Sequence, residues 1–137
     1  MEALFGIPAT VGGAVVMNAG AFSVNISHFI DRVCVLENGQ KKVYEKEDCL
    51  FAYRNSIFKV LKLPILYVDF SFFNVNIVNA RKNINEYIKL RKEKQPCGKS
   101  CGSVFKNPLG YTAGKIIESV ALKGKTIGGA TISNKHA

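Results

Sequence analysis

Two short loops carry the side chains best suited to chemistry. The first, residues 53–56, sets Arg54 beside a tyrosine, an asparagine and a serine. A guanidinium held in such a loop can grip a carboxylate through two parallel hydrogen bonds, or it can bind local carbonyls. The second loop, residues 102–108, places Ser103 directly after a glycine. Its hydroxyl can donate a proton to a carbanion-like carbon if cations lie nearby, or it can cap the loop.

A hydrolytic triad has little support in this sequence. The chain contains no G-x-S-x-G pattern, and its only histidines are His28 and His136. A serine nucleophile needs a neighbouring base that removes its proton. The sequence therefore favours a loop-capping or proton-donor role for Ser103 over a nucleophilic one.

A glycine-rich stretch lies near the start of the chain, where residues 6–21 read GIPATVGGAVVMNAGA. Glycine lets a backbone approach a ligand closely, and successive amides in such a turn suit a diphosphate. The spacing matches neither the G-x-G-x-x-G dinucleotide fingerprint nor the G-x-x-x-x-G-K-[ST] phosphate loop. Taken alone, the stretch is either a structural turn or a ligand cradle.

The formal net charge of +9 invites a nucleic-acid interpretation, because eight lysines and arginines lie within residues 81–106. Such a run can neutralise the phosphates of a polymer or of a nucleotide. Aromatic residues are sparse there, and no RNA-binding signature is present. A solvated basic face is the simpler interpretation, and a non-catalytic nucleotide- or nucleic-acid-binding module is the alternative function.

Other bulk properties indicate a cytoplasmic globular protein. Hydrophobic residues make up 47% of the chain. No apolar run approaches the ~18 residues that a membrane helix needs, and the start has no signal-peptide pattern. Cys97 and Cys101 have a spacing compatible with zinc, but Cys34 and Cys49 offer no matching pair. We therefore expect reduced thiols and no metal.

The elements that must position these residues follow from periodicity and turn signals. Strands are expected at 14–17, 30–36, 42–45, 65–73 and 127–132. Helices are expected at 80–92 and 112–120, the second capped by Thr112, with a single helical turn at 46–50. Irregular loops are expected at 51–58 and 95–108, and Asn38-Gly39 should close a hairpin. The asparagine-rich segment 74–79 marks a domain boundary in an α+β chain.

Five segments in register resemble the UDP-N-acetylenolpyruvoylglucosamine reductase (MurB) family of bacterial cell-wall synthesis. They are residues 6–21, 53–58, 102–108, 122–124 and 127–137. The resemblance implies that residues 1–76 are the second part of an FAD-binding domain built mostly from antiparallel strands. It implies that residues 77–137 are a smaller α/β substrate-binding domain, truncated at its C-terminus.

The resemblance also implies a reaction. In that family NADPH reduces bound FAD, and the flavin passes hydride to UDP-N-acetylglucosamine enolpyruvate, giving UDP-N-acetylmuramate. Ser103 matches the serine that protonates the neighbouring carbon, and Arg54 matches the arginine that stabilises the enolate and the substrate carboxylate. Tyr53, Lys106 and Asn107 match substrate-binding positions.

The FAD contacts implied by the resemblance are ten residues of the glycine-rich stretch. They are Gly6, Ile7, Pro8, Thr10, Val11, Gly12, Gly13, Ala14, Asn18 and Gly20. The resemblance implies a small-molecule substrate and no nucleic acid, membrane, metal or obligate protein partner.

Several positions depart from the family pattern. Ala9 and Ala121 stand where glycine is usual, and Cys101 stands where alanine is common. The family also has a segment before the glycine-rich stretch that completes the FAD site. A further segment after residue 137 supplies a catalytic glutamate. We therefore expect this chain alone to bind FAD weakly or not at all and to lack reductase activity.

Overall fold

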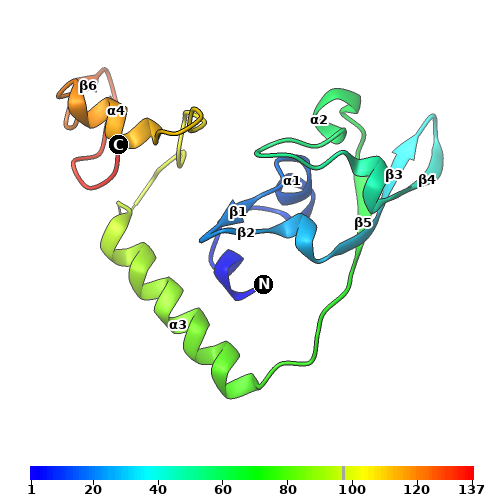
Figure 1. The fold of residues 1–137 in the computed structure, drawn as a ribbon. Helices are drawn as coiled ribbons and strands as arrows, with labels where there is room; N and C mark the ends of the chain where they lie inside the picture. The colour runs from blue at the N-terminus through cyan, green and yellow to red at the C-terminus, as the bar shows by residue number, and fades with distance from the viewer. Residues whose placement is uncertain (97) are drawn as a thin grey trace. The chain divides into compact units, whose positions relative to one another are not determined.

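The computed structural model of the protein describes residues 1–96 and 98–137. They form two compact units, Met1–Tyr87 and Ile88–Ala137, which divide within the long helix α3 (Ile77–Lys94) (Figure 1). The boundary predicted after residue 76 falls directly before this helix. Among the described residues, no helix has both the length and the apolar character needed to cross a bilayer.

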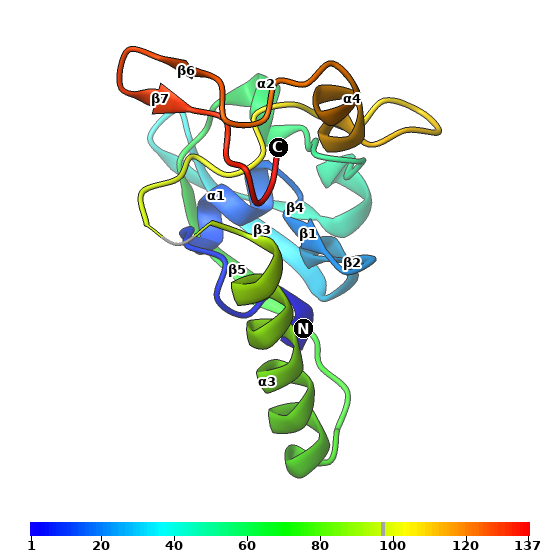
Figure 2. The same cartoon turned by 90° about the vertical axis from the view of Figure 1, so that its left-hand side faces the viewer.

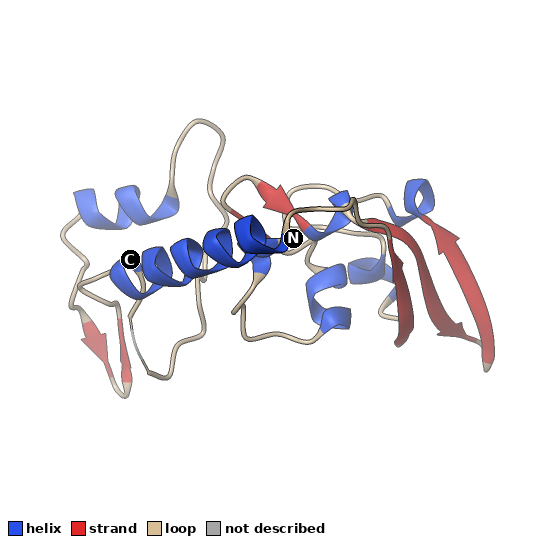
Figure 3. Cartoon of the chain, turned by 90° about the horizontal axis from the view of Figure 1, so that it is seen from below, coloured by secondary structure: helices blue, strands red, loops and turns tan. Residues whose placement is uncertain are grey.

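The first unit is built on a three-stranded antiparallel sheet of order β4-β3-β5, visible as three adjacent red strands in Figure 3. Its strands are β3 (Ile30–Glu37), β4 (Gln40–Glu45) and β5 (Ile65–Phe70). The buried side chains of β3 join those of the neighbouring elements in one core, which comprises Val15, Ile26, Ile30, Val33, Val35, Tyr44, Cys49 and Phe58. Burial of these side chains is the main force that holds the unit together.

The hairpin between β3 and β4 confirms the turn predicted from Asn38-Gly39. Both residues have positive φ angles, 49° and 78°, as a type I′ turn requires. The partners Glu37 and Gln40 close the ladder directly beside this turn, so β4 begins two residues before the predicted 42–45.

The strand predicted at 14–17 is wrong, because this segment belongs to helix α1 (Val11–Val16). Thr10 caps the helix: its Oγ1 accepts a hydrogen bond from the Gly13 N–H at 3.1 Å. The valines favoured a strand by propensity, but the cap and the packing of α1 against β5 and α2 (Phe58–Leu61) outweigh that preference (Figure 2). Only Val15 of this helix is fully buried.

Short elements connect α1 to the sheet and β4 to α2. Helix η1 (Glu2–Leu4) precedes the glycine-rich stretch, and β1 (Gly20–Ala21) pairs with β2 (Val24–Asn25) after it. Helix η2 (Ile26–His28) leads into β3. Helix η3 (Lys46–Cys49) confirms the predicted helical turn. Strand β5 ends at Phe70, three residues before the predicted end.

Helix α3 confirms the predicted helix and extends it at both ends. Its half-buried residues lie at helical spacing and include Ile84, Tyr87, Ile88 and Arg91, as the periodicity predicts. Residues 95 and 96 and residues 98–108 form no regular element, as expected, whereas Cys97 and the zinc spacing that includes it lie outside the described residues.

The second unit contains helix α4 (Ala113–Ser119) and a small hairpin of β6 (Thr126–Ile127) and β7 (Ala130–Thr131). Thr112 caps α4 as predicted, because its side chain accepts from the Lys115 N–H at 3.4 Å. The single strand predicted at 127–132 is wrong: Gly128 adopts φ 57° and turns the chain back. The mixture of helices with antiparallel strands confirms the α+β class.

Candidate functional site

Arg54 is held against the glycine-rich stretch of the first unit. Its guanidinium Nη2 donates a hydrogen bond to the Gly20 carbonyl at 2.6 Å. The Arg54 Cζ lies 5.3 Å from the centroid of the Tyr53 ring, at cation–π distance. The backbone turns sharply here, since Arg54 has φ 53° and Ala52 and Asn55 exchange two backbone hydrogen bonds. One end of the guanidinium is thus fixed, and its other donors make no further hydrogen bond with described residues.

A side chain at Gly20 would crowd this contact. A Cβ at this position would lie 2.0 Å from Asn25 Oδ1 and 3.0 Å from both Arg54 Nη1 and the Val24 carbonyl oxygen. Real Cβ atoms do not approach other atoms so closely as the first of these distances. The absent side chain therefore makes room for the guanidinium beside β1.

Two further hydrogen bonds join the Arg54 loop to the same stretch. The Asn18 Nδ2 donates to the Ala52 carbonyl at 3.0 Å. The Ser56 hydroxyl donates to the Val16 carbonyl at 2.8 Å. Residue Val16 ends α1, so this bond satisfies one of the carbonyls that a helix leaves unpaired at its C-terminus. The structure therefore brings together two sequence motifs that lie more than thirty positions apart.

The residues predicted to contact FAD differ in their exposure. Gly6, Pro8, Thr10, Val11 and Gly13 are exposed, and Ile7, Gly12, Ala14 and Gly20 are half-buried. Gly6 has φ 79° and no atom within 4 Å of the position of a Cβ, so its backbone is open to a ligand. Asn18 is different, because it is buried and both of its amide atoms already bind protein.

Cys49 binds the chain just after the Arg54 loop through the backbone of Ile57. Its carbonyl accepts the Ile57 N–H at 2.9 Å, and its thiol donates to the Glu45 carbonyl at 3.3 Å. Burial, together with the charges of the nearby carboxylates, raises the pKa of the Cys49 thiol to about 11. Burial therefore disfavours the Cys49 thiolate, and the two hydrogen bonds of this residue serve the fold.

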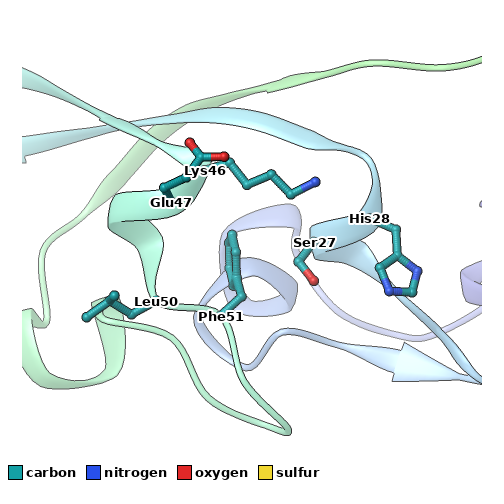
Figure 4. A pocket seen from close by; sticks show the side chains of 6 residues that line it. All are labelled: Ser27, His28, Lys46, Glu47, Leu50 and Phe51. Atoms are coloured by element: carbon teal, nitrogen blue, oxygen red, sulfur yellow. The ribbon is translucent and has the colours of Figure 1, made fainter.

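A small open cavity of about 380 Å³ lies elsewhere on the first unit (Figure 4). It is lined by Ser27, His28, Lys46, Glu47, Leu50 and Phe51. His28 serves the local fold, because its Nδ1 accepts the Asn25 N–H at 3.5 Å. The cavity contains none of the predicted site residues.

In the second unit, Ser103 lies exposed in the loop before α4. The preceding Gly102 adopts φ 71°, and its N–H donates to the Ser100 hydroxyl at 3.1 Å. Lys106 is also exposed. This arrangement leaves the Ser103 hydroxyl and the Lys106 amine at the surface of the unit.

Asn107 has a role in the fold that its motif did not reveal. Its Oδ1 accepts the Ala113 N–H at 3.0 Å, at the first residue of α4. Because Asn107 precedes the helix by six residues, local capping patterns give no signal for this bond. Tyr53 and Arg54 lie in the first unit, and Ser103, Lys106 and Asn107 lie in the second.

Comparisons with known proteins identify the relatives of this chain. Residues 92–137 match the family model described as UDP-N-acetylenolpyruvoylglucosamine reductase, C-terminal domain. A UDP-N-acetylenolpyruvoylglucosamine reductase of Thermotoga maritima is 45% identical over 139 residues, which cover 100% of this chain and 49% of that protein. The reductase of Caldanaerobacter subterraneus is 42% identical over 134 residues, which cover 96% of this chain and 44% of that protein.

A solved structure is similar over the same span. The crystal structure of UDP-N-acetylenolpyruvylglucosamine reductase (MurB) from Thermus caldophilus superimposes with a TM-score of 0.90 and 37% identity. The match covers 98% of this chain and 50% of that one. The resemblance to this reductase family is therefore confirmed along the chain, and the chain spans about half the length of the curated relatives it matches.

Proposed function

We propose that this chain supplies one wall of the flavin site and the substrate loops of a UDP-N-acetylenolpyruvoylglucosamine reductase. Such a reductase serves peptidoglycan precursor synthesis: it uses NADPH to reduce UDP-N-acetylglucosamine enolpyruvate to UDP-N-acetylmuramate. The observation that carries this proposal is the 2.6 Å hydrogen bond that holds the Arg54 guanidinium on the Gly20 carbonyl of the glycine-rich stretch. It fixes a cation on the same glycine-rich stretch whose exposed residues, among them Gly6 and Gly13, suit a diphosphate-bearing cofactor.

FAD would lie against residues 6–13, where exposed positions such as Gly6 leave the backbone open to a ligand. The bound flavin would supply the hydride chemistry. The exposed residues Gly6, Thr10 and Gly13 are the best candidates for direct contact. Asn18, whose amide nitrogen and oxygen both bind protein, would support the site through the fold.

Arg54 would bind the substrate carboxylate and the negative charge that develops on the enolate. A guanidinium keeps its charge at every physiological pH, and its planar fork matches a carboxylate. Fixing one Nη leaves the remaining donors for the substrate, so little reorganisation is needed when charge develops. The Tyr53 ring beside Arg54 restricts the guanidinium further.

Ser103 would donate the proton to the carbon next to the reduced one. The loop leaves its hydroxyl exposed, as a proton donor to a bound ligand requires. Lys106, which is also exposed, would bind the UDP-sugar by its charge. Asn107 would contribute by holding the start of α4 in place.

A titration of the isotope-labelled chain, followed residue by residue by NMR, tests this proposal against the basic-module alternative. We expect millimolar FAD to shift the amide signals of residues 6–20 and the enolpyruvyl substrate to shift those of residues 53–56 and 102–107. A short RNA should give weaker shifts along α3 that disappear as salt rises, since phosphate neutralisation by lysines is screened. Salt-sensitive RNA binding without any FAD response would instead support the alternative.

A further inference from the structure

The hydrogen bonds between the Arg54 loop and the glycine-rich stretch follow a regular pattern. On one side they use alternate residues of the stretch, and on the other alternate residues of the loop. The partners are Val16 with Ser56, Asn18 with Ala52, and Gly20 with Arg54. Only the last of these bonds involves the proposed substrate-binding cation; the other two hold the backbone that carries it.

Asn18 and Ser56 are among the few buried polar residues in the part of the chain that the structure describes. Asn18 is 4% exposed and Ser56 is 1% exposed. The Asn18 Oδ1 accepts the Ser27 N–H at 3.3 Å while its Nδ2 donates to Ala52, so the side chain joins η2 to the loop. Its backbone φ of 42° is one that asparagine tolerates better than most residues. Both side chains are thus buried, and each of their polar atoms already binds the protein.

Arg54 needs such support because its own conformation is unfavourable. Its φ of 53° lies in the left-handed region, where a residue with a Cβ is strained. A free arginine side chain also samples many rotamers, and a single bond to Gly20 would not restrict the backbone of Arg54. The bonds at residues 52 and 56 lie two positions to either side of Arg54 and fix the loop that presents it.

We infer that Asn18 and Ser56 are positioning residues that hold the Arg54 guanidinium in its substrate-binding orientation. This inference rests on the proposed function for what Arg54 binds, but the positioning itself belongs to the chain without ligand. Asn18 would then act through the loop rather than by touching the cofactor. Ser56 would couple the C-terminal end of α1 to the same loop.

The test compares Ser56→Ala and Asn18→Asp in the 137-residue chain. Asn18→Asp keeps an oxygen for the Ser27 N–H and removes the donor to Ala52. The readout is the hydrogen exchange of the Arg54 Nη2–H, which donates to the Gly20 carbonyl, measured by NMR. Both variants should exchange faster by about tenfold, the factor expected when one hydrogen bond that fixes the loop is lost. Ser56→Thr, which retains the hydroxyl, should restore slow exchange.

A core variant separates positioning from general loss of stability. Val35→Ala removes buried volume from β3 and should lower the free energy of unfolding at least as much as Ser56→Ala. It should leave the Arg54 Nη2–H exchange slow under native conditions. The inference is overturned if exchange stays slow in Ser56→Ala and Asn18→Asp, or if Val35→Ala accelerates it equally. If the loop variants loosen Arg54 but substrate still binds unchanged, the proposed role of Arg54 fails and its positioning stands.

Discussion

Replacing Gly20 by alanine tests the packing around Arg54 most sharply. The new Cβ would lie 2.0 Å from Asn25 Oδ1, so the Asn25 side chain must leave its place as the cap of η2. Loss of a cap costs about 1 kcal/mol. The remaining contacts at 3.0 Å, with Arg54 Nη1 and the Val24 carbonyl, add overpacking of about 1–3 kcal/mol. We expect Gly20→Ala to lower the free energy of unfolding by roughly 2–4 kcal/mol.

Urea unfolding followed by circular dichroism measures this loss, and Gly12→Ala is its matched control. At Gly12 a Cβ would meet only Ile65 Cβ, at an ordinary 3.7 Å, within helix α1. Alanine is the better helix former, so this variant should be neutral or more stable by up to about 1 kcal/mol. The reasoning is refuted if Gly20→Ala unfolds at the wild-type urea concentration, or if Gly12→Ala is the more damaging of the two.

Two other predictions concern residues outside this contact. Ala121 follows α4 and has a left-handed φ of 54°, which strains a residue with a Cβ. Ala121→Gly should therefore raise the free energy of unfolding by about 1 kcal/mol, measured by urea unfolding. An unchanged or lower free energy of unfolding would contradict this. Cys49, with its pKa raised by burial from 9.0 to about 11, contributes stability that is full below pH 9 and is lost as pH rises through 11. Cys49→Ala should therefore flatten the alkaline decline in thermal stability, and an identical decline in both proteins would rule this cause out.

The sequence predicted correctly the turns and helix caps that depend only on neighbouring residues. Asn38-Gly39 favours a type I′ turn by itself, and Thr112 caps α4 from a position that the sequence reveals. The valines of α1 wrongly predicted a strand, because β-propensity is a weak preference. The hydrogen bond from the Gly13 N–H to the Thr10 side chain, together with packing, outweighed it. The hairpin at Gly128 was missed because a glycine pair inside an apolar run did not break the predicted strand.

The candidate site was predictable in its residue types but not in its connections. The sequence indicated that Arg54 could bind a carboxylate or local carbonyls, and the structure shows one carbonyl, that of Gly20. The roles of Asn18 and Ser56 depend on partners 34 and 40 residues away, which no local pattern encodes. The backbone at Ala121, by contrast, was predictable. Glycine is usual at this position in the family that the sequence resembles, which indicates a left-handed backbone, and Ala121 has a φ of 54°.

The decisive readout of the ligand titration is the guanidinium of Arg54 itself. We propose that the glycine-rich stretch and the Arg54 loop, joined by three hydrogen bonds, both face the flavin and substrate. Adding FAD should therefore shift the amides of residues 10–13, and adding the enolpyruvyl substrate should shift the Arg54 Nε–H signal in the same sample. Substrate that leaves the Arg54 Nε–H signal unmoved, while FAD shifts only residues outside 6–20 and 53–56, would contradict the account.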